Sequence, residues 1–182
     1  MSTRATDAGT AATRSRILDA TGVALAQFGP RKLSLTDIAQ IAGVSRPTLY
    51  RHFASKEELL VALAAHEKLR YEAGLASALH GLTGNARLQA ALQFIIDFQN
   101  DYPLRGLVLI EPGFMLEQLE HALHTMASAM VPLFEQGRSP TRAGRADAAD
   151  IADLIVRVAL SHFVIPGDDA QLLRELRHVA GI

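Results

Sequence analysis

The sequence predicts an all-α protein of about nine helices, with an N-terminal three-helix unit and a C-terminal helical bundle. Apolar residues recur at three- and four-residue intervals along most of the chain, which is the spacing of one helix face. Glycines and prolines fall mostly between these segments, where they end helices. Of the 182 residues, 49% are hydrophobic and none is cysteine, which favours a compact core without disulfides.

The first helix is expected from about Thr13 to Phe28. Its apolar residues form one stripe, and Gly29 and Pro30 follow where a helix would end. Residues 1–10 are polar and contain a glycine, so we expect them to form a disordered arm.

Residues 34–56, SLTDIAQIAGVSRPTLYRHFASK, have the pattern of a helix-turn-helix. Ser34 can cap a short helix, and Gly43 permits the left-handed backbone that ends this helix and turns the chain. Ser45 can cap a second helix with Pro47 in its first turn, where the missing N–H breaks no helical hydrogen bond. This arrangement is typical of a motif that places its second helix in the major groove of DNA; a helical hairpin in an ordinary bundle is the alternative.

The second helix of this motif has an inner and an outer face. Val44, Leu49 and Phe53 would pack against the preceding helix, and the polar residues between them would face outward. The candidate DNA-binding residues are Ser34, Thr36, Ser45, Arg46, Pro47, Thr48, Tyr50, Arg51, His52 and Lys56.

The run IAQIAGVSRPTLYRHFASKEEL, residues 38–59, resembles the DNA-binding signature of the tetracycline repressor (TetR) family. The resemblance implies an all-helical dimeric transcription regulator, usually a repressor, that a small molecule releases from its operator. By position it implies base-reading or groove-facing roles for Arg46, Pro47 and Thr48, and phosphate contacts for Tyr50, His52 and Lys56. Arg46 stands where the tetracycline repressor has glutamine; arginine favours guanine and glutamine favours adenine, so the operator does not carry over.

Charge is distributed unevenly along the chain. Residues 1–56 contain 8 Lys and Arg against 3 acidic residues, a net charge of +5, whereas the remainder contains 10 against 16, a net charge of −6. A basic end and an acidic body are typical of a protein that meets phosphates at one end; chance clustering of exposed charges is the alternative. Arg14 and Arg16 would lie in a first helical turn, which costs up to about 1 kcal/mol each unless an anion such as a DNA phosphate offsets it.

The rest of the chain, residues 57–182, predicts an effector-binding and dimerisation domain, with residues 1–56 as the DNA-binding domain. Ser55 and Glu58 have the spacing of a capping box that opens a long helix. Helices are expected at about 56–79, 88–102, 104–110, 114–134, 147–164 and 168–179, with a loop at 136–145.

The last two predicted helices have broad apolar faces. We expect them to pack against a second copy of the chain as a four-helix bundle, since a two-fold protein reads two half-sites of a palindromic operator. An ordinary core within one chain is the alternative. The candidate interface residues are Ile151, Leu154, Ile155, Val158, His162, Leu172 and Leu176.

Aromatic and methionine residues in the middle of the chain are candidates for an effector pocket, and plain core is the alternative. The candidate pocket residues are Phe94, Phe98, Leu107, Ile110, Phe114, Met115, Met126 and Met130. His121, His124, Gln99 and Arg105 are candidate polar anchors. The ligand expected for such a set is an apolar or amphipathic small molecule.

Two other classes of function compete with a ligand-responsive repressor. One is a DNA-binding architectural protein or regulator without an effector. The other is a metal-dependent enzyme, since Glu117, Glu120, His121 and His124 could share a helix face. We expect no catalytic residues, metal or cofactor, because the H-E-x-x-H, glycine-rich phosphate-loop and G-x-S-x-G patterns are missing from the sequence.

The N-terminal segment lacks the apolar core, about seven residues or longer, of a secretory signal. An uninterrupted apolar run of about 18 residues, as a membrane span requires, is also missing. Together with the lack of cysteine, these features predict a cytoplasmic protein without a membrane partner.

Overall fold

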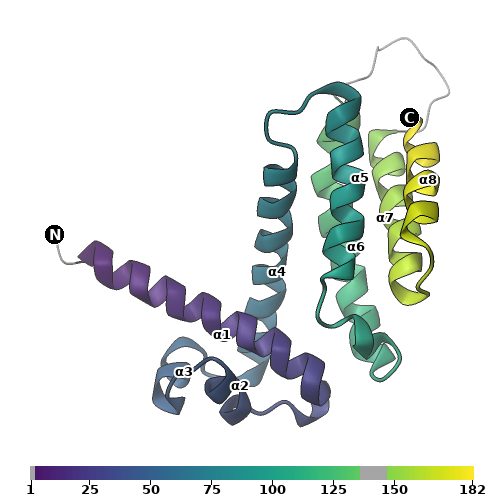
Figure 1. The fold of residues 1–182 in the computed structure, drawn as a ribbon. Coiled ribbons are helices and arrows are strands. Elements are labelled where there is room, and N and C mark those ends of the chain that lie inside the picture. The colour runs from purple at the N-terminus through teal and green to yellow at the C-terminus, as the bar shows by residue number, and fades with distance from the viewer. Residues whose placement is uncertain (1–2, 136–146) are drawn as a thin grey trace. The chain divides into compact units, whose positions relative to one another are not determined.

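The computed structural model describes residues 3–135 and 147–182, and within these ranges the chain is helical and contains no strand. The elements in chain order are α1 (Thr3–Lys32), α2 (Leu35–Ile41), α3 (Arg46–His52), α4 (Lys56–Ala78), α5 (Gly84–Asn100), the 3-10 helix η1 (Arg105–Val108), α6 (Pro112–Glu135), α7 (Ala148–Val164) and α8 (Asp169–Ala180) (Figure 1). The all-α prediction is confirmed. The loop predicted at residues 136–145 lies outside the described residues.

The chain forms two compact units. The first comprises the chain up to Glu67 together with Gly106–Met115, and the second comprises Lys68–Arg105 and the chain from Leu116 onward. Helix α4 therefore begins in the first unit and continues into the second. Because such units group residues in mutual contact and do not define domain boundaries, the division into domains 1–56 and 57–182 stays a prediction.

The expectation of a disordered arm over residues 1–10 is wrong for the described part, since α1 begins at Thr3. Polarity suggested disorder, but the segment contains two alanines, one glycine and no proline, so it can continue the helix without a break. Arg14 and Arg16 consequently lie inside α1 and not in its first turn. The argument that they oppose the helix dipole at its start is therefore also wrong.

The predicted stop of the first helix is visible as a kink within α1. Gly29 has φ 71° and ψ 166°, which is not helical, and Pro30 follows before one short helical turn. A residue other than glycine rarely adopts a positive φ, so Gly29 permits the turn that leads from α1 to α2.

The core of the first unit is formed where α1 packs on α2 and α2 packs on α3. Its fully or almost fully buried side chains include Ile17, Leu18, Leu25, Ile38, Ala39, Leu49 and Phe53. Leu107 and Met115 also belong to this unit and are 3% and 1% exposed.

The second unit has its own hydrophobic core, to which α4, α5, α6, α7 and α8 all contribute. Its buried members include Tyr71, Leu92, Ile95, Ile96, Met130, Ile155, Val156, Leu172 and Leu176. The Tyr71 ring lies 5.3 Å from the Phe94 ring and 5.2 Å from the Phe98 ring, the latter edge-on, which is a favourable geometry for aromatic pairs.

Most predicted helix bounds in this part of the chain are close to the observed ones. Helix α5 begins at Gly84, earlier than expected, and the segment 104–110 forms only the short 3-10 helix η1. Helix α6 begins at Pro112, two residues before the expected start at 114, because proline fits the first turn of a helix.

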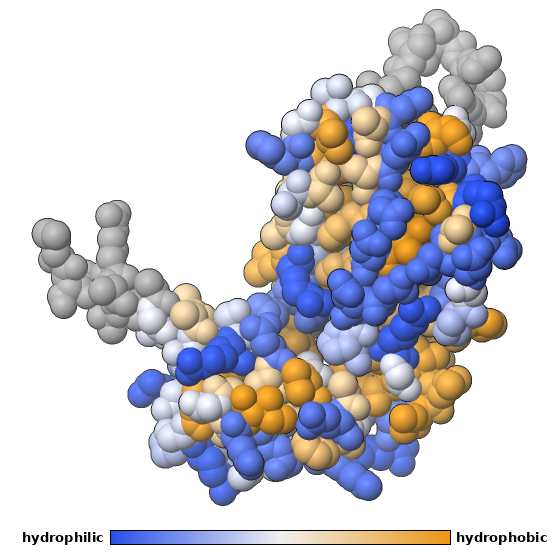
Figure 2. Space-filling view, viewed as in Figure 1, coloured by the Kyte–Doolittle hydropathy of each residue, from blue (hydrophilic) through white to orange (hydrophobic). Residues whose placement is uncertain are grey.

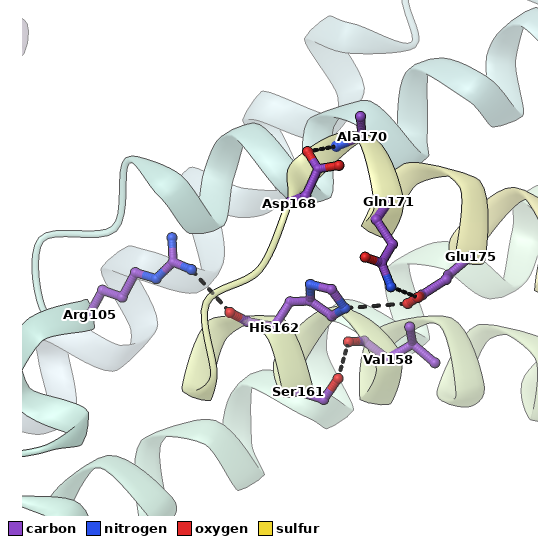
Figure 3. A network of polar contacts seen from close by, with 8 residues as sticks. All are labelled: Arg105, Val158, Ser161, His162, Asp168, Ala170, Gln171 and Glu175. Carbon is purple, nitrogen blue, oxygen red and sulfur yellow. Dashed lines mark hydrogen bonds and ion pairs between the residues drawn. The ribbon is translucent and has the colours of Figure 1, made fainter.

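Polar contacts join α7 to α8 in the second unit (Figure 3). His162 Nε2 lies 3.3 Å from Glu175 Oε2, and the Gln171 amide donates to Glu175 Oε1 at 2.8 Å. The Gln171 bond is the main reason why the pKa of Glu175 lies below its usual value, and His162 adds to the effect. Arg105 donates to the carbonyl of His162 at 3.0 Å, so this histidine is held on both its ring and its backbone.

The surface drawn in Figure 2 is mostly hydrophilic, with apolar residues exposed in places between the polar ones. Isolated exposed apolar side chains are normal on a protein surface and do not by themselves mark a site. Among the described residues, no helix is both long and apolar enough to cross a membrane.

Candidate nucleic-acid interface

The helix-turn-helix forms as the local sequence predicts. The Ser34 hydroxyl accepts a hydrogen bond from the Thr36 amide at 3.1 Å at the start of α2. Gly43 has φ 63°, and the Val44 amide donates to the Ala39 carbonyl at 2.9 Å, which closes the turn. A side-chain cap thus begins α2, and a left-handed glycine after its end directs the chain into α3.

The second helix, α3, is capped in the same way. The Ser45 hydroxyl accepts from the Thr48 amide at 3.2 Å, and Pro47 lies in the first turn. The hydroxyls of Ser45 and Thr48 are also 2.9 Å apart and hydrogen-bonded to each other. The start of α3 is therefore held in one conformation before any ligand binds, which lowers the entropic cost of inserting this helix into a groove.

Two of the three residues predicted to face inward at α3 are fully or almost fully buried. Leu49 and Phe53 are 0% and 1% exposed, as the periodicity predicted, and Val44 is half-buried. None of the ten candidate DNA-binding residues is buried: Thr36, Ser45, Arg46, Pro47, Tyr50 and Arg51 are exposed, and Ser34, Thr48, His52 and Lys56 are half-buried. These residues are accessible to a partner, and their contacts with DNA stay a prediction.

Lys56 has a partner inside the protein. Its ammonium donates a hydrogen bond to the Pro30 carbonyl, at the end of α1. Further along α4, His66 Nε2 lies 2.9 Å from Asp19 Oδ1 of α1. An ammonium has three N–H donors, so Lys56 can brace the first unit and still reach a phosphate with a second donor.

The capping box at the start of α4 is only half formed. The Ser55 hydroxyl accepts from the Glu58 amide at 3.1 Å, as predicted. The Glu58 carboxylate, however, accepts from the Ala54 amide at 2.7 Å, one residue before the expected partner. Both contacts still satisfy free amides around the helix start, so the stabilising effect of the box is retained.

Sequence reasoning missed a contact between α1 and the end of α3. The guanidinium carbon of Arg14 lies 5.0 Å from the centre of the Phe53 ring, within the range of a cation–π interaction. Phe53 is the C-cap residue of α3. The only available signal was the positive charge of Arg14, because periodicity does not show which distant residues meet.

The candidate dimer residues differ in their accessibility. Ile155, Leu172 and Leu176 are 0%, 2% and 0% exposed and belong to the core of their own chain. For these three residues the alternative of an ordinary intrachain core applies, because α8 covers the inner face of α7. Leu154 is 49% exposed, and the half-buried residues are Ile151, Val158 and His162.

The candidate effector residues are divided between the two units. Phe94, Phe98, Met126 and Met130 belong to the second unit, where they form or contact its core. Leu107, Ile110, Phe114 and Met115 belong to the first unit, and Ile110 is 72% exposed. Among the described residues, the Tyr71 hydroxyl and the Gln99 amide nitrogen are buried without a hydrogen-bond partner in the second unit.

The candidate metal residues do not gather into a site in the part of the chain that the structure describes. No group of three or more His, Asp or Glu side chains there could hold a metal ion. His121 instead forms a hydrogen bond of 2.8 Å with the carbonyl of Glu117 on its own helix.

Comparison with known proteins agrees with this geometry. Residues 17–63 match the model of the family described as bacterial regulatory proteins, tetR family. The HTH-type transcriptional activator FasR of Mycolicibacterium smegmatis is 36% identical over 86 residues, which cover 47% of this chain and 39% of FasR. The HTH-type transcriptional regulator TtgR of Pseudomonas putida is 43% identical over 51 residues, 28% of this chain and 24% of TtgR. The matched segments thus span less than half of these relatives.

Solved structures resemble the chain over most of its length. The fatty acid degradation regulator FadR of Bacillus halodurans has a TM-score of 0.65 at 20% identity, covering 91% of this chain and 93% of FadR. FadR of Bacillus subtilis, determined in complex with stearoyl-CoA, has a TM-score of 0.64 at 18% identity, covering 92% of this chain and 98% of FadR. At such low identity these similarities establish the fold alone.

Proposed function

We propose that the chain is a member of the tetR family of bacterial regulatory proteins, whose model matches residues 17–63, and that it is a ligand-responsive repressor that binds a palindromic operator as a homodimer. The observation that carries the proposal is the exposed outer face of α3. This face presents Arg46, Tyr50 and Arg51 on a helix whose start is capped and whose inner side is buried. Such a helix can enter the major groove without rearrangement.

The distribution of charge supports the same partner. Residues 1–56 carry a net charge of +5, and the remainder carries −6. Duplex DNA attracts the basic end and repels the acidic body, so the charge distribution favours binding through the helix-turn-helix.

A homodimer is the assembly expected for a protein that reads a palindromic operator, because each subunit then meets one half-site. Leu154 of α7 is 49% exposed, and its half-buried neighbours Ile151 and Val158 lie on the same helix. A second copy could cover these apolar side chains. The two α3 helices of such a dimer would meet half-sites about one turn of DNA, or a multiple of it, apart.

We further propose an amphipathic effector that binds in the second unit. The interior of that unit is apolar, yet the hydroxyl of Tyr71 and the amide nitrogen of Gln99 are buried there without a hydrogen-bond partner among the described residues. An unsatisfied buried polar group costs about 1–3 kcal/mol. A ligand with an apolar body and a polar group would remove this cost, and stearoyl-CoA, found with the Bacillus subtilis FadR, is a first candidate.

Release requires the effector to favour one conformer strongly. To change operator occupancy from nearly full to nearly empty, it must bind the released state about 10⁴-fold more tightly, or about 5.5 kcal/mol. Helix α4 runs from the first unit into the second and offers a continuous path for such coupling.

The test begins with selection of bound duplexes from a random pool. We expect enrichment of an inverted repeat, binding of this repeat at a salt concentration that releases random DNA, and weaker binding in the presence of acyl-CoA thioesters or another amphipathic ligand. A monomer at micromolar concentration without preference for any inverted repeat would contradict the proposal. Specific binding that no ligand affects would favour the alternative of a regulator without an effector.

A further inference from the structure

We propose that Arg14 is an additional phosphate-contacting residue of the DNA-binding surface, held in position by the ring of Phe53. The inference deepens the proposed function and rests on it. The helix-dipole argument that first suggested a phosphate near Arg14 is wrong, because Arg14 lies inside α1. The inference rests instead on the contact between Arg14 and Phe53.

The geometry places the cation beside the end of the recognition helix. The guanidinium carbon of Arg14 is 5.0 Å from the centre of the Phe53 ring, and Phe53 is the C-cap residue of α3. Arg51 and His52, the basic residues in the last turn of the same helix, directly precede Phe53 in the chain. Positive charge is favourable at a helix C-terminus, where the helix dipole is negative.

The dimensions of the groove bring this end close to phosphates. Helix α3 has seven residues and is about 10 Å long, whereas the major groove is about 12 Å wide. A side chain at the end of an inserted helix is therefore near the backbone that borders the groove. Arg14 is exposed, and a cation–π contact uses none of the five N–H donors of its guanidinium as a hydrogen bond, so they can bind a phosphate.

A purely structural role is the competing explanation. Phe53 is only 1% exposed, and the Arg14 side chain covers part of its ring. In that case Arg14 would stabilise the first unit without contacting DNA. The two roles depend on different parts of the Arg14 side chain. Packing on the Phe53 ring needs only its aliphatic chain, whereas a contact with a DNA phosphate needs its positive charge.

Two substitutions separate these requirements. Arg14→Met keeps a long stem over the ring and removes the charge, and Arg14→Lys keeps the charge and loses the planar group. We would measure binding to a mixed-sequence duplex long enough for two half-sites, at several salt concentrations, together with the melting temperature. We expect Arg14→Met to bind about tenfold more weakly and to reduce the slope of log affinity against log salt by about 0.9 per protomer. Arg14→Lys should keep the slope, and both variants should melt near the wild type.

Arg16→Met is the matched control. Arg16 is also exposed on α1, and two residues rotate its side chain by about 200° around the helix, away from Phe53. We expect this variant to keep the wild-type salt slope. An unchanged slope for Arg14→Met, or an equal loss for Arg16→Met, would overturn the inference while leaving the proposed function intact. Failure of the wild type to bind any duplex would overturn both.

Discussion

Replacement of Gly43 by alanine tests whether the left-handed turn between α2 and α3 shapes the DNA-binding surface. Gly43 has φ 63°, a conformation that costs a residue with a Cβ about 1–2 kcal/mol. Among the described residues, no heavy atom lies within 4 Å of the position that a Cβ would take, so steric collision does not increase the free-energy cost of the substitution. Alanine also restricts the unfolded chain, which returns about 0.4–1 kcal/mol. The expected net loss of stability is about 1 kcal/mol.

This loss corresponds to about a fivefold change in the folding equilibrium constant of the first unit. Urea unfolding followed by circular dichroism would measure it, and fluorescence anisotropy with a selected duplex would measure DNA affinity. If α3 shifts to relieve the backbone strain, the affinity for DNA should fall by more than fivefold, which is more than the change in the folding equilibrium. Gly43→Asn should be milder in both assays, because asparagine tolerates the left-handed region better than alanine.

Gly113→Ala provides the control for the loss of a glycine as such. Gly113 lies in the first turn of α6 without a positive φ, and no described heavy atom lies within 4 Å of its Cβ position. Alanine should leave stability unchanged or raise it by up to about 1 kcal/mol. The reasoning about Gly43 is refuted if its alanine variant is as stable as the wild type, or if asparagine is as damaging as alanine.

Three further substitutions test the surface and the core. Arg46→Ala should weaken operator binding by about 1–3 kcal/mol and relax specificity at one base pair per half-site, and an unchanged profile in duplex selection would remove it from base reading. Lys56→Ala should weaken binding to all duplexes alike and reduce the salt slope; because its ammonium also binds the Pro30 carbonyl, it should lower the melting temperature too, and a changed base preference would contradict the phosphate assignment. Gly74→Ala would place a Cβ 2.8 Å from the Phe94 ring, so we expect a loss of about 1–3 kcal/mol in unfolding free energy, and wild-type stability would show that the ring moves freely.

The helix-turn-helix was predictable because its determinants are local. Ser34, Gly43 and Ser45 each act on backbone groups a few residues away, so the order of residue types contains the information for both caps and the turn. The ends of the longer helices were predicted within a few residues for the same reason. The start of α1 was not, because a polar sequence rich in alanine is compatible with both a helix and an arm.

Burial in the second unit could be predicted only in part. Ile155, Leu172 and Leu176 have the apolar periodicity of an interface, and the same periodicity fits a core. Periodicity shows that a face must be covered and does not show which element covers it. The packing of α8 on α7 decides that these three residues face their own chain.

The sequence alone determined that the chain is helical, that residues 34–56 form a helix-turn-helix, and that this motif lies in the basic N-terminal part of the chain. Only the tertiary structure decided that Lys56 binds the Pro30 carbonyl, that the guanidinium of Arg14 lies over the Phe53 ring, and which apolar residues remain accessible. The physical reason is the range of the interactions. Caps and helical periodicity join neighbours along the chain, whereas these contacts join residues that meet only when separate helices pack together.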